Sequence, residues 1–131
     1  MSFWVFKSYL TAVGEHGRDE IDDWYKTLPP QAQAKFRTIL EQLRDLPQHL
    51  WPPTWVKPLS QGQGVFEVRF KVRNVLYRPL GFFGPDRSEF TFLIGAREQG
   101  DEFVPRNALQ TAVQRKDIVL GERGRAHEFR L

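Results

Sequence analysis

Charged side chains recur at alternate positions in the run VFEVRFKVRNVLYRP, residues 65–79. Successive side chains of an extended chain point to opposite faces, so this run has one apolar face, formed by Phe66, Val68, Phe70 and Val72. The other face is formed by Glu67, Arg69, Lys71 and Arg73. Guanidinium and ammonium groups on one face favour a phosphate-bearing ligand, although a solvated strand face without a ligand would have the same composition.

The net positive charge of the chain lies in its second half. Residues 1–60 contain 7 Lys and Arg against 7 Asp and Glu, whereas residues 61–131 contain 12 against 9, which accounts for the formal charge of +3. A local excess of basic residues is typical of proteins that bind nucleic acid. The apolar and charged fractions, 40% and 27%, are those of an ordinary globular domain.

The sequence contains no pattern typical of a metal site. It has no cysteine, and its three histidines, His16, His49 and His127, have no spacing that suits a metal ion. We therefore expect neither a metal nor another cofactor. No apolar run approaches the ~18 residues of a membrane span, and the N-terminal residues lack the basic start of a secretion signal. These features predict a cytoplasmic protein that does not contact the membrane.

The elements that must position the charged face follow from residue periodicity. Residues 3–13 are rich in aromatic and β-branched side chains and predict a strand. Apolar residues at helical spacing, with four carboxylates in the first turn, predict a helix over 19–28. Pro29 and Pro30 end this helix, and a second one follows, which Pro47 stops. Because the linker is so short, we expect an antiparallel helical hairpin.

Three antiparallel strands are predicted next, over 65–72, 75–83 and 89–96, followed by a third helix over 104–117. The predicted fold class is α+β, with an N-terminal strand, a helical hairpin, a three- to four-stranded antiparallel sheet and a C-terminal helix. Residues 1–120 are expected to form one domain. Residues 121–131 contain two glycines and no periodicity, which indicates a flexible C-terminal tail.

The order of these elements, together with the motifs WVKPL, VFEVRF, NVLYRP and FLIGARE, resembles the RelE/ParE toxin superfamily. The similarity is greatest to its phage-derived, Gp49-like and HigB-like branch. It implies a RelE-like fold and the toxin of a type II toxin–antitoxin pair, a metal-independent endoribonuclease that cuts mRNA on the ribosome. The implied partners are a helix-turn-helix antitoxin, the ribosome and mRNA, in a homodimer or a toxin–antitoxin heterotetramer.

The superfamily also implies an alternative function. Its ParE-like members block DNA gyrase, so a non-catalytic or gyrase-directed binding protein of phage origin would have a similar sequence. The presence of a neighbouring reading frame for a small helix-turn-helix protein would favour the toxin pair.

The resemblance also implies roles for individual basic residues. Arg78, in the motif YR, would stabilise the transition state, and Arg69 and Arg97 would bind phosphate. Lys57 matches a lysine that binds RNA or orients its loop, and the RNA-binding face would extend over Lys71 and Arg73. Each arginine has an alternative role, which is to pair with a neighbouring glutamate on a solvated strand face.

Cleavage of RNA by its own 2′-hydroxyl also needs an acid and a base. Glu98 or Glu67 would act as the base, and His127, near the C-terminus, as the acid. The alternative to a role as the base is that Glu67 and the acidic segment 98–102 repel RNA and leave the surface inactive.

Overall fold

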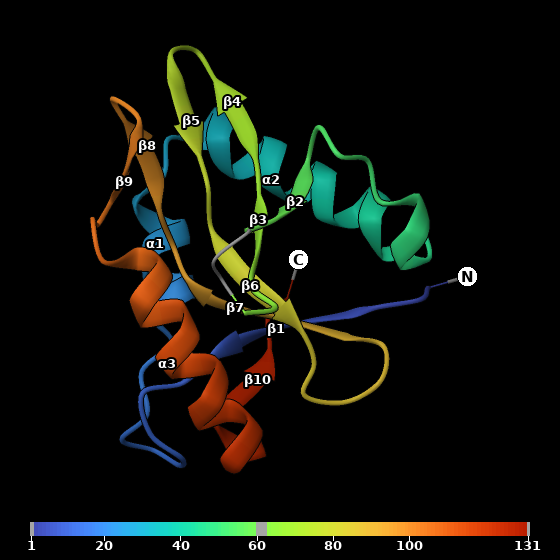
Figure 1. The fold of residues 1–131 in the computed structure, drawn as a ribbon, viewed down its shortest axis with the longest axis vertical. Helices are drawn as coiled ribbons and strands as arrows, with labels where there is room; N and C mark the ends of the chain where they lie inside the picture. Colours follow the sequence, from blue (N-terminus) through green and yellow to red (C-terminus); the bar gives the residue numbers. More distant parts are fainter. Residues whose placement is uncertain (1, 60–62, 131) are drawn as a thin grey trace.

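Two sheets form the centre of the protein. The structure is a computed structural model that describes residues 2–59 and 63–130. The six-stranded sheet contains, in spatial order, β10 (Ala126–Glu128), β1 (Val5–Tyr9), β7 (Glu89–Ile94), β6 (Leu80–Phe83), β3 (Phe66–Val68) and β2 (Val56–Pro58). The four-stranded sheet contains β4 (Phe70–Val72), β5 (Val75–Tyr77), β8 (Arg97–Gln99) and β9 (Glu102–Val104). Figure 1 shows the strands and helices. Among the paired strands of the described residues, only β1 and β7 are parallel.

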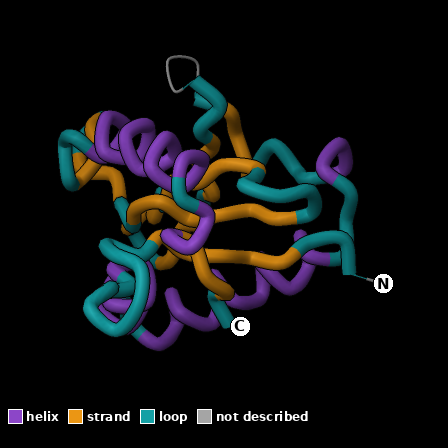
Figure 2. The backbone as a smooth tube through the Cα atoms, turned by 90° about the horizontal axis from the view of Figure 1, so that it is seen from below, coloured by secondary structure: helices purple, strands orange, loops and turns teal. Residues whose placement is uncertain are grey.

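Helices cover both faces of the main sheet. The helices are α1 (Glu20–Thr27), α2 (Pro30–Arg44) and α3 (Ala108–Gly121), with single 3-10 turns at η1 (Gln48–Leu50) and η2 (Arg123–Arg125). α3 packs on β6 and β7, whereas α1 packs on β1 and β7 and α2 packs on β4. Figure 2 shows the strands between these two helical layers. No helix of the described residues is both long and apolar enough to span a membrane.

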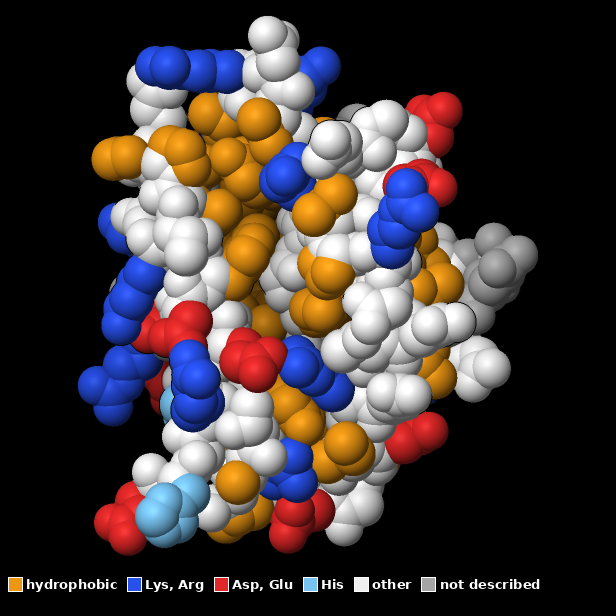
Figure 3. All heavy atoms as spheres, turned by 90° about the vertical axis from the view of Figure 1, so that its left-hand side faces the viewer, with side chains coloured by type: hydrophobic (Ala, Val, Ile, Leu, Met, Phe, Trp, Pro, Cys, Tyr) orange, Lys and Arg blue, Asp and Glu red, His pale blue; other side chains and the backbone are white. Residues whose placement is uncertain are grey.

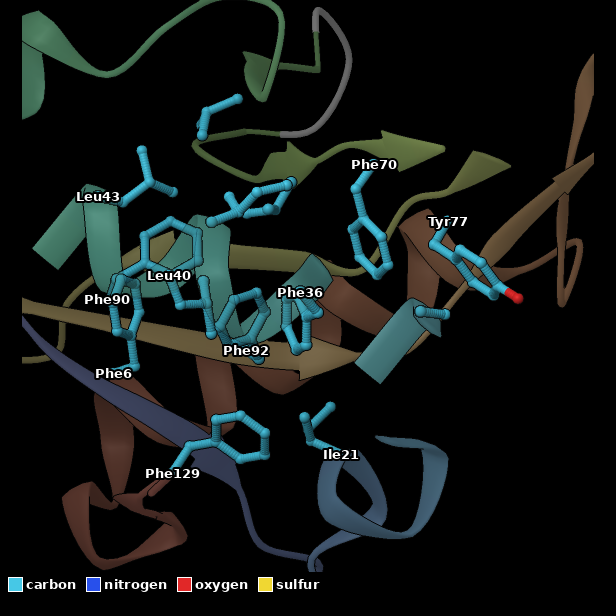
Figure 4. Packing of buried hydrophobic residues seen from close by; sticks show 14 of the residues in the cluster. Phe6, Ile21, Phe36, Leu40, Leu43, Phe70, Tyr77, Phe90, Phe92 and Phe129 are labelled. Atoms are coloured by element: carbon cyan, nitrogen blue, oxygen red, sulfur yellow. The ribbon is translucent and has the colours of Figure 1, made fainter. Parts of the chain in front are cut away.

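Each helical layer encloses its own apolar core. The core beneath α1 and α2 is rich in aromatic rings, and Figure 4 shows Phe36 of α2 beside Phe70 and Phe92. The Phe36 ring stacks on Phe70 with centroids 5.1 Å apart and meets Phe92 edge-on at 5.4 Å. The core beneath α3 consists of aliphatic and aromatic side chains that include Leu80 and Leu93. The sequence prediction of an α+β fold is confirmed.

The helix starts agree closely with the sequence for α1 and α2. The Asp19 carboxylate accepts a hydrogen bond from the backbone N–H of Asp22 at 2.9 Å and so caps α1, and Pro30 begins α2. The predicted start of the third helix at 104 is wrong, because residues 102–104 pair with β8 and α3 begins only at Ala108.

The long strands predicted over 65–72 and 75–83 are each broken in two. The backbone N–H of Arg69 donates to the carbonyl of Trp55, beside β2, whereas the next residue, Phe70, pairs with Tyr77 of β5 in the other sheet. On the neighbouring strand, Pro79 has no N–H to donate, and its carbonyl accepts from Val68 at 3.0 Å. The chain therefore passes from one sheet to the other at Arg69 and again at Arg78, which places both arginines at the junction of the two sheets.

The flexible tail predicted for residues 121–131 is replaced by ordered elements, as far as the described residues reach; Leu131 lies outside them. Residues Ala126–Glu128 form β10, which pairs antiparallel with β1, and the backbone N–H of Phe129 donates to the carbonyl of Phe6 at 2.8 Å. The Phe129 ring is buried in the core beneath α1 and α2. Periodicity did not reveal this order, because β10 and Phe129 are held by contacts with residues far away in the chain.

Candidate functional site

Glu67 is the centre of a cluster of charged residues at the junction of the sheets. Its side chain is only 3% exposed, and both of its oxygens accept hydrogen bonds. Nη1 of Arg69 donates to Oε1 at 2.9 Å, and Nε of Arg78 donates to Oε2 at 2.6 Å. The sequence placed Glu67 on a solvated face, and this is wrong. A carboxylate tolerates such burial because two guanidinium groups replace its hydration.

The strand pairing explains why Glu67 is buried. It lies opposite Leu80 of β6 on one side and opposite Lys57 of β2 on the other, so its backbone is inside the sheet. The neighbouring residues Phe66 and Val68 face α2, as the alternating pattern predicts, and Glu67 faces the opposite side. That side is partly covered by the core beneath α3 and by Phe103.

Arg78 connects Glu67 to the second sheet. Its Nη1 donates to Oε1 of Glu98 at 3.2 Å, and its guanidinium carbon lies 4.0 Å from the centroid of the Phe103 ring. Glu98 and Phe103 are directly opposite each other on β8 and β9. The side chain of Arg78 is 13% exposed and that of Glu98 is 31% exposed. We call Arg69, Glu67, Arg78 and Glu98 the arginine–glutamate network; its formal charges sum to zero.

Arg97 is not part of this network. It precedes Glu98 on β8, and successive strand residues point to opposite faces. Its Nη1 contacts Oε1 of Gln99 at 3.4 Å, and it lines a pocket together with Trp24 and Tyr77. The structure therefore separates Arg97 from the two arginines with which the sequence grouped it.

Of the three other basic residues of the predicted RNA-binding face, one lies beside the network and two lie on the β4–β5 hairpin. Lys57 is exposed and pairs with Glu67 in the sheet register, so it adds a positive charge directly beside the network. Lys71 and Arg73 are exposed on the β4–β5 hairpin. Arg73 occupies the turn with φ 55° and donates through Nε to Oε1 of Gln31 at 3.2 Å.

His127, the residue suggested as the acid, lies far from the network. It is on β10, and the strands β1, β7 and β6 separate β10 from Glu67 on β3. Its Nε2 is 2.6 Å from Oδ2 of Asp19, which also accepts a hydrogen bond from Oγ of Ser8 at 2.7 Å. The contact fixes the C-terminal strand to the start of α1.

Phe103 was missed in the sequence, whereas the pairing of Arg69 and Arg78 with Glu67 and Glu98 agrees with the alternative role that the sequence allowed. No local pattern marks Phe103, because β8 and β9 are each only three residues long and their charged residues do not alternate regularly with apolar ones. The only usable signal was an aromatic residue within an otherwise acidic segment. Among the described residues, no three His, Cys, Asp or Glu side chains are grouped so as to hold a metal ion.

Comparison with known proteins identifies a family. Its model, described as "Phage derived protein Gp49-like", matches residues 23–117, which include all four members of the arginine–glutamate network. Comparisons with curated proteins and with solved structures give no match. Since the match extends over well more than half of the sequence, the chain belongs to the phage-derived Gp49-like family.

Proposed function

We propose that the protein is the toxin of a type II toxin–antitoxin pair and that it cuts mRNA on the ribosome. The observation that carries this proposal is the pair of guanidinium groups of Arg69 and Arg78 on one buried carboxylate, with Glu98 in contact with Arg78. Two fixed cations beside a carboxylate suit the transfer of a phosphoryl group by a 2′-hydroxyl. The RelE/ParE-like motifs and the phage-derived family also support it.

Within this proposal each member of the network has a chemical role. Glu98 is the more accessible carboxylate and removes the proton of the 2′-hydroxyl, whose oxygen then attacks the phosphorus. Arg78 stabilises the charge that develops on the phosphate oxygens, and Arg69 binds the phosphate. The 5′-oxygen leaves and takes a proton from solvent, since His127 is too distant, and the product is a 2′,3′-cyclic phosphate. Glu67 is a positioning residue that holds both guanidinium groups.

Other residues serve binding in this proposal. Lys57 lies beside the network, and Lys71 and Arg73 continue the positive charge onto the β4–β5 hairpin, where they would contact the RNA backbone. The protein would act in the cytoplasm, and a helix-turn-helix antitoxin would restrain it by covering this surface.

The test is to map cuts in a defined mRNA on purified ribosomes by primer extension. We expect cuts with the wild type and a loss of about 100-fold in the cleavage rate with Arg78→Lys. This variant keeps the positive charge but cannot form the bidentate hydrogen bonds of a guanidinium group. Arg123→Lys is the matched control. Arg123 lies on η2, outside the network, where its side chain is 64% exposed and forms an ion pair with Asp86. Intact mRNA after incubation with folded wild-type protein would refute the proposal.

A second function is favoured by the charge balance of the network. Glu67 and Glu98 already neutralise Arg69 and Arg78, and Arg78 is mostly buried against Phe103. Such a cluster also suits a purely structural role in a non-catalytic or gyrase-directed binding protein. This alternative predicts that mRNA stays intact on the ribosome while the protein inhibits DNA supercoiling by gyrase.

A further inference from the structure

An apolar groove lies on the face of β8 opposite Glu98, away from the arginine–glutamate network. Two adjoining pockets of about 340 and 470 Å³ share Pro29 and Tyr77 as lining residues. The first extends over Trp24 and Pro105, and the second extends over Val75. We call this surface the Pro29–Tyr77 groove. Figure 3 shows hydrophobic side chains gathered in a hollow on this side of the molecule, with basic side chains at its borders.

Each pocket of the groove contains one arginine. Arg73 lines the larger pocket and Arg97 lines the smaller one. Both contact neutral amide oxygens, of Gln31 at 3.2 Å and of Gln99 at 3.4 Å, and neither forms an ion pair within the described part of the chain. Arg69 and Arg78 differ, because carboxylates neutralise both of them. The groove therefore presents two uncompensated positive charges beside an apolar floor.

We propose that the Pro29–Tyr77 groove binds a segment of another protein that presents apolar side chains flanked by carboxylates. The apolar floor of the groove binds the apolar side chains of the partner, and Arg73 and Arg97 pair with its carboxylates. The proline residues of the rim are fixed in φ, so little conformational entropy is lost when a partner binds. This proposal does not depend on nuclease activity.

The lining favours a protein partner over RNA. Single-stranded RNA binds such surfaces by stacking its bases on open aromatic faces. Tyr77 is only 6% exposed, and its ring stacks on Phe70 with centroids 5.1 Å apart. Trp24 lies against the backbone of Gly95, where a Cβ atom would come within 2.2 Å of the indole ring. The Tyr77 ring is covered and Gly95 occupies one side of the Trp24 indole, so stacking of bases is restricted, whereas aliphatic side chains fit against Val75 and the prolines.

The experiment is a selection of displayed random peptides on the immobilised full-length protein, with counter-selection on the variant Val75→Asp. We expect enriched peptides that combine Leu, Ile or Phe with Asp or Glu. The affinity of the best labelled peptide, measured by fluorescence anisotropy, should fall about tenfold in Arg73→Gln and in Arg97→Gln. It should remain unchanged in Arg123→Gln, a matched exposed arginine on η2.

Three results would overturn the proposal. These are the absence of any enriched peptide, enriched peptides whose binding is unchanged in both arginine variants, and binding of single-stranded RNA that weakens in both Val75→Asp and Arg97→Gln, since neither residue belongs to the proposed RNA surface. If Val75→Asp does not fold, Arg73→Gln serves for the counter-selection, because that side chain is exposed on a turn. Cleavage of mRNA is not a readout here, so failure of the nuclease proposal would leave these results interpretable.

Discussion

Nε of Arg78 lies 2.6 Å from Oε2 of Glu67, and this contact joins the two sheets at the point where both strands of the hairpin break. The Glu67 side chain is 3% exposed and the Arg78 side chain 13%, so water screens the pair only weakly. Removal of one partner of such a pair leaves a buried charge with fewer hydrogen bonds, which is costly. The network therefore affects both stability and chemistry, and the two effects have to be measured separately.

The first prediction concerns stability. Arg78→Met should lower the free energy of unfolding by about 3 kcal/mol, because Glu67 remains buried with Arg69 as its charged partner. The double variant Glu67→Gln/Arg78→Met should lose less than Arg78→Met alone, since it removes the buried charge as well. Urea unfolding followed by tryptophan fluorescence measures both. Arg106→Met is the control, since that side chain is 86% exposed, and it should change stability by less than about 0.5 kcal/mol. Equal effects of Arg78→Met and Arg106→Met would contradict the prediction.

The second prediction separates two roles of Glu98. If Glu98 is the base, Glu98→Gln should slow single-turnover cleavage of RNA by about 100-fold. The same variant should bind RNA more tightly, because a negative charge beside Arg78 is removed. Glu102→Gln, at a side chain that is 62% exposed, is the control for general charge effects. An increase in both cleavage and binding would show that Glu98 only screens Arg78.

The third prediction concerns the C-terminal segment. Phe129→Ala should lower the free energy of unfolding by about 3 kcal/mol, because the ring packs among Tyr25, Phe36 and Phe92. Phe3→Ala, at a side chain that is 41% exposed, should cost less than about 1 kcal/mol. Thermal unfolding provides the comparison, and similar losses in both variants would mean that residues after Gly121 contribute little to the core.

The fourth prediction uses a pair of glycines. A Cβ atom on Gly81 would lie 2.5 Å from Cε1 of Phe90 and 2.6 Å from the carbonyl oxygen of Thr91, so Gly81→Ala should destabilise the fold by about 1–3 kcal/mol. Gly121 has no atom within 4 Å of such a position and ends α3, so Gly121→Ala should stabilise the fold by up to about 1 kcal/mol. Chemical denaturation of the two variants checks the sign of each change; destabilisation by both would contradict this prediction.

Local patterns predicted the parts of this fold that local forces determine. The alternation of Phe66, Val68, Phe70 and Val72 was interpreted correctly, because all four side chains pack on the core with Phe36 although the strand breaks at Arg69. The helices α1 and α2 were predicted from apolar residues at helical spacing, from the carboxylates in the first turn of α1 and from the prolines that end each helix. The strands β2, β8, β9 and β10 were missed, since each has three residues and depends on partners that no local pattern reveals.

The candidate site was only partly predictable for the same reason. Alternation along one strand correctly placed Glu67 and Arg69 on the same face, but the burial of Glu67 depends on Arg78, which lies between β5 and β6, and on the pairing of β3 with β2 and β6. Arg97 and Glu98 are adjacent in the sequence, and only the pairing of β8 shows that one faces the groove and the other faces Arg78. Residue type indicated the chemistry, whereas tertiary pairing determined which groups meet.

The position of β1 between β7 and β10 also has a consequence for the nascent chain. β1 is translated before both of its neighbours, Glu89–Phe92 and Ala126–Glu128, which follow more than 75 residues later. Until then both edges of β1 are unpaired, and Phe6 has no partner such as Phe90 or Phe92. Contacts between distant parts of a chain form slowly, and unpaired strands promote aggregation. We therefore expect the unfinished polypeptide, with β1 unpaired, to aggregate more readily than the complete fold.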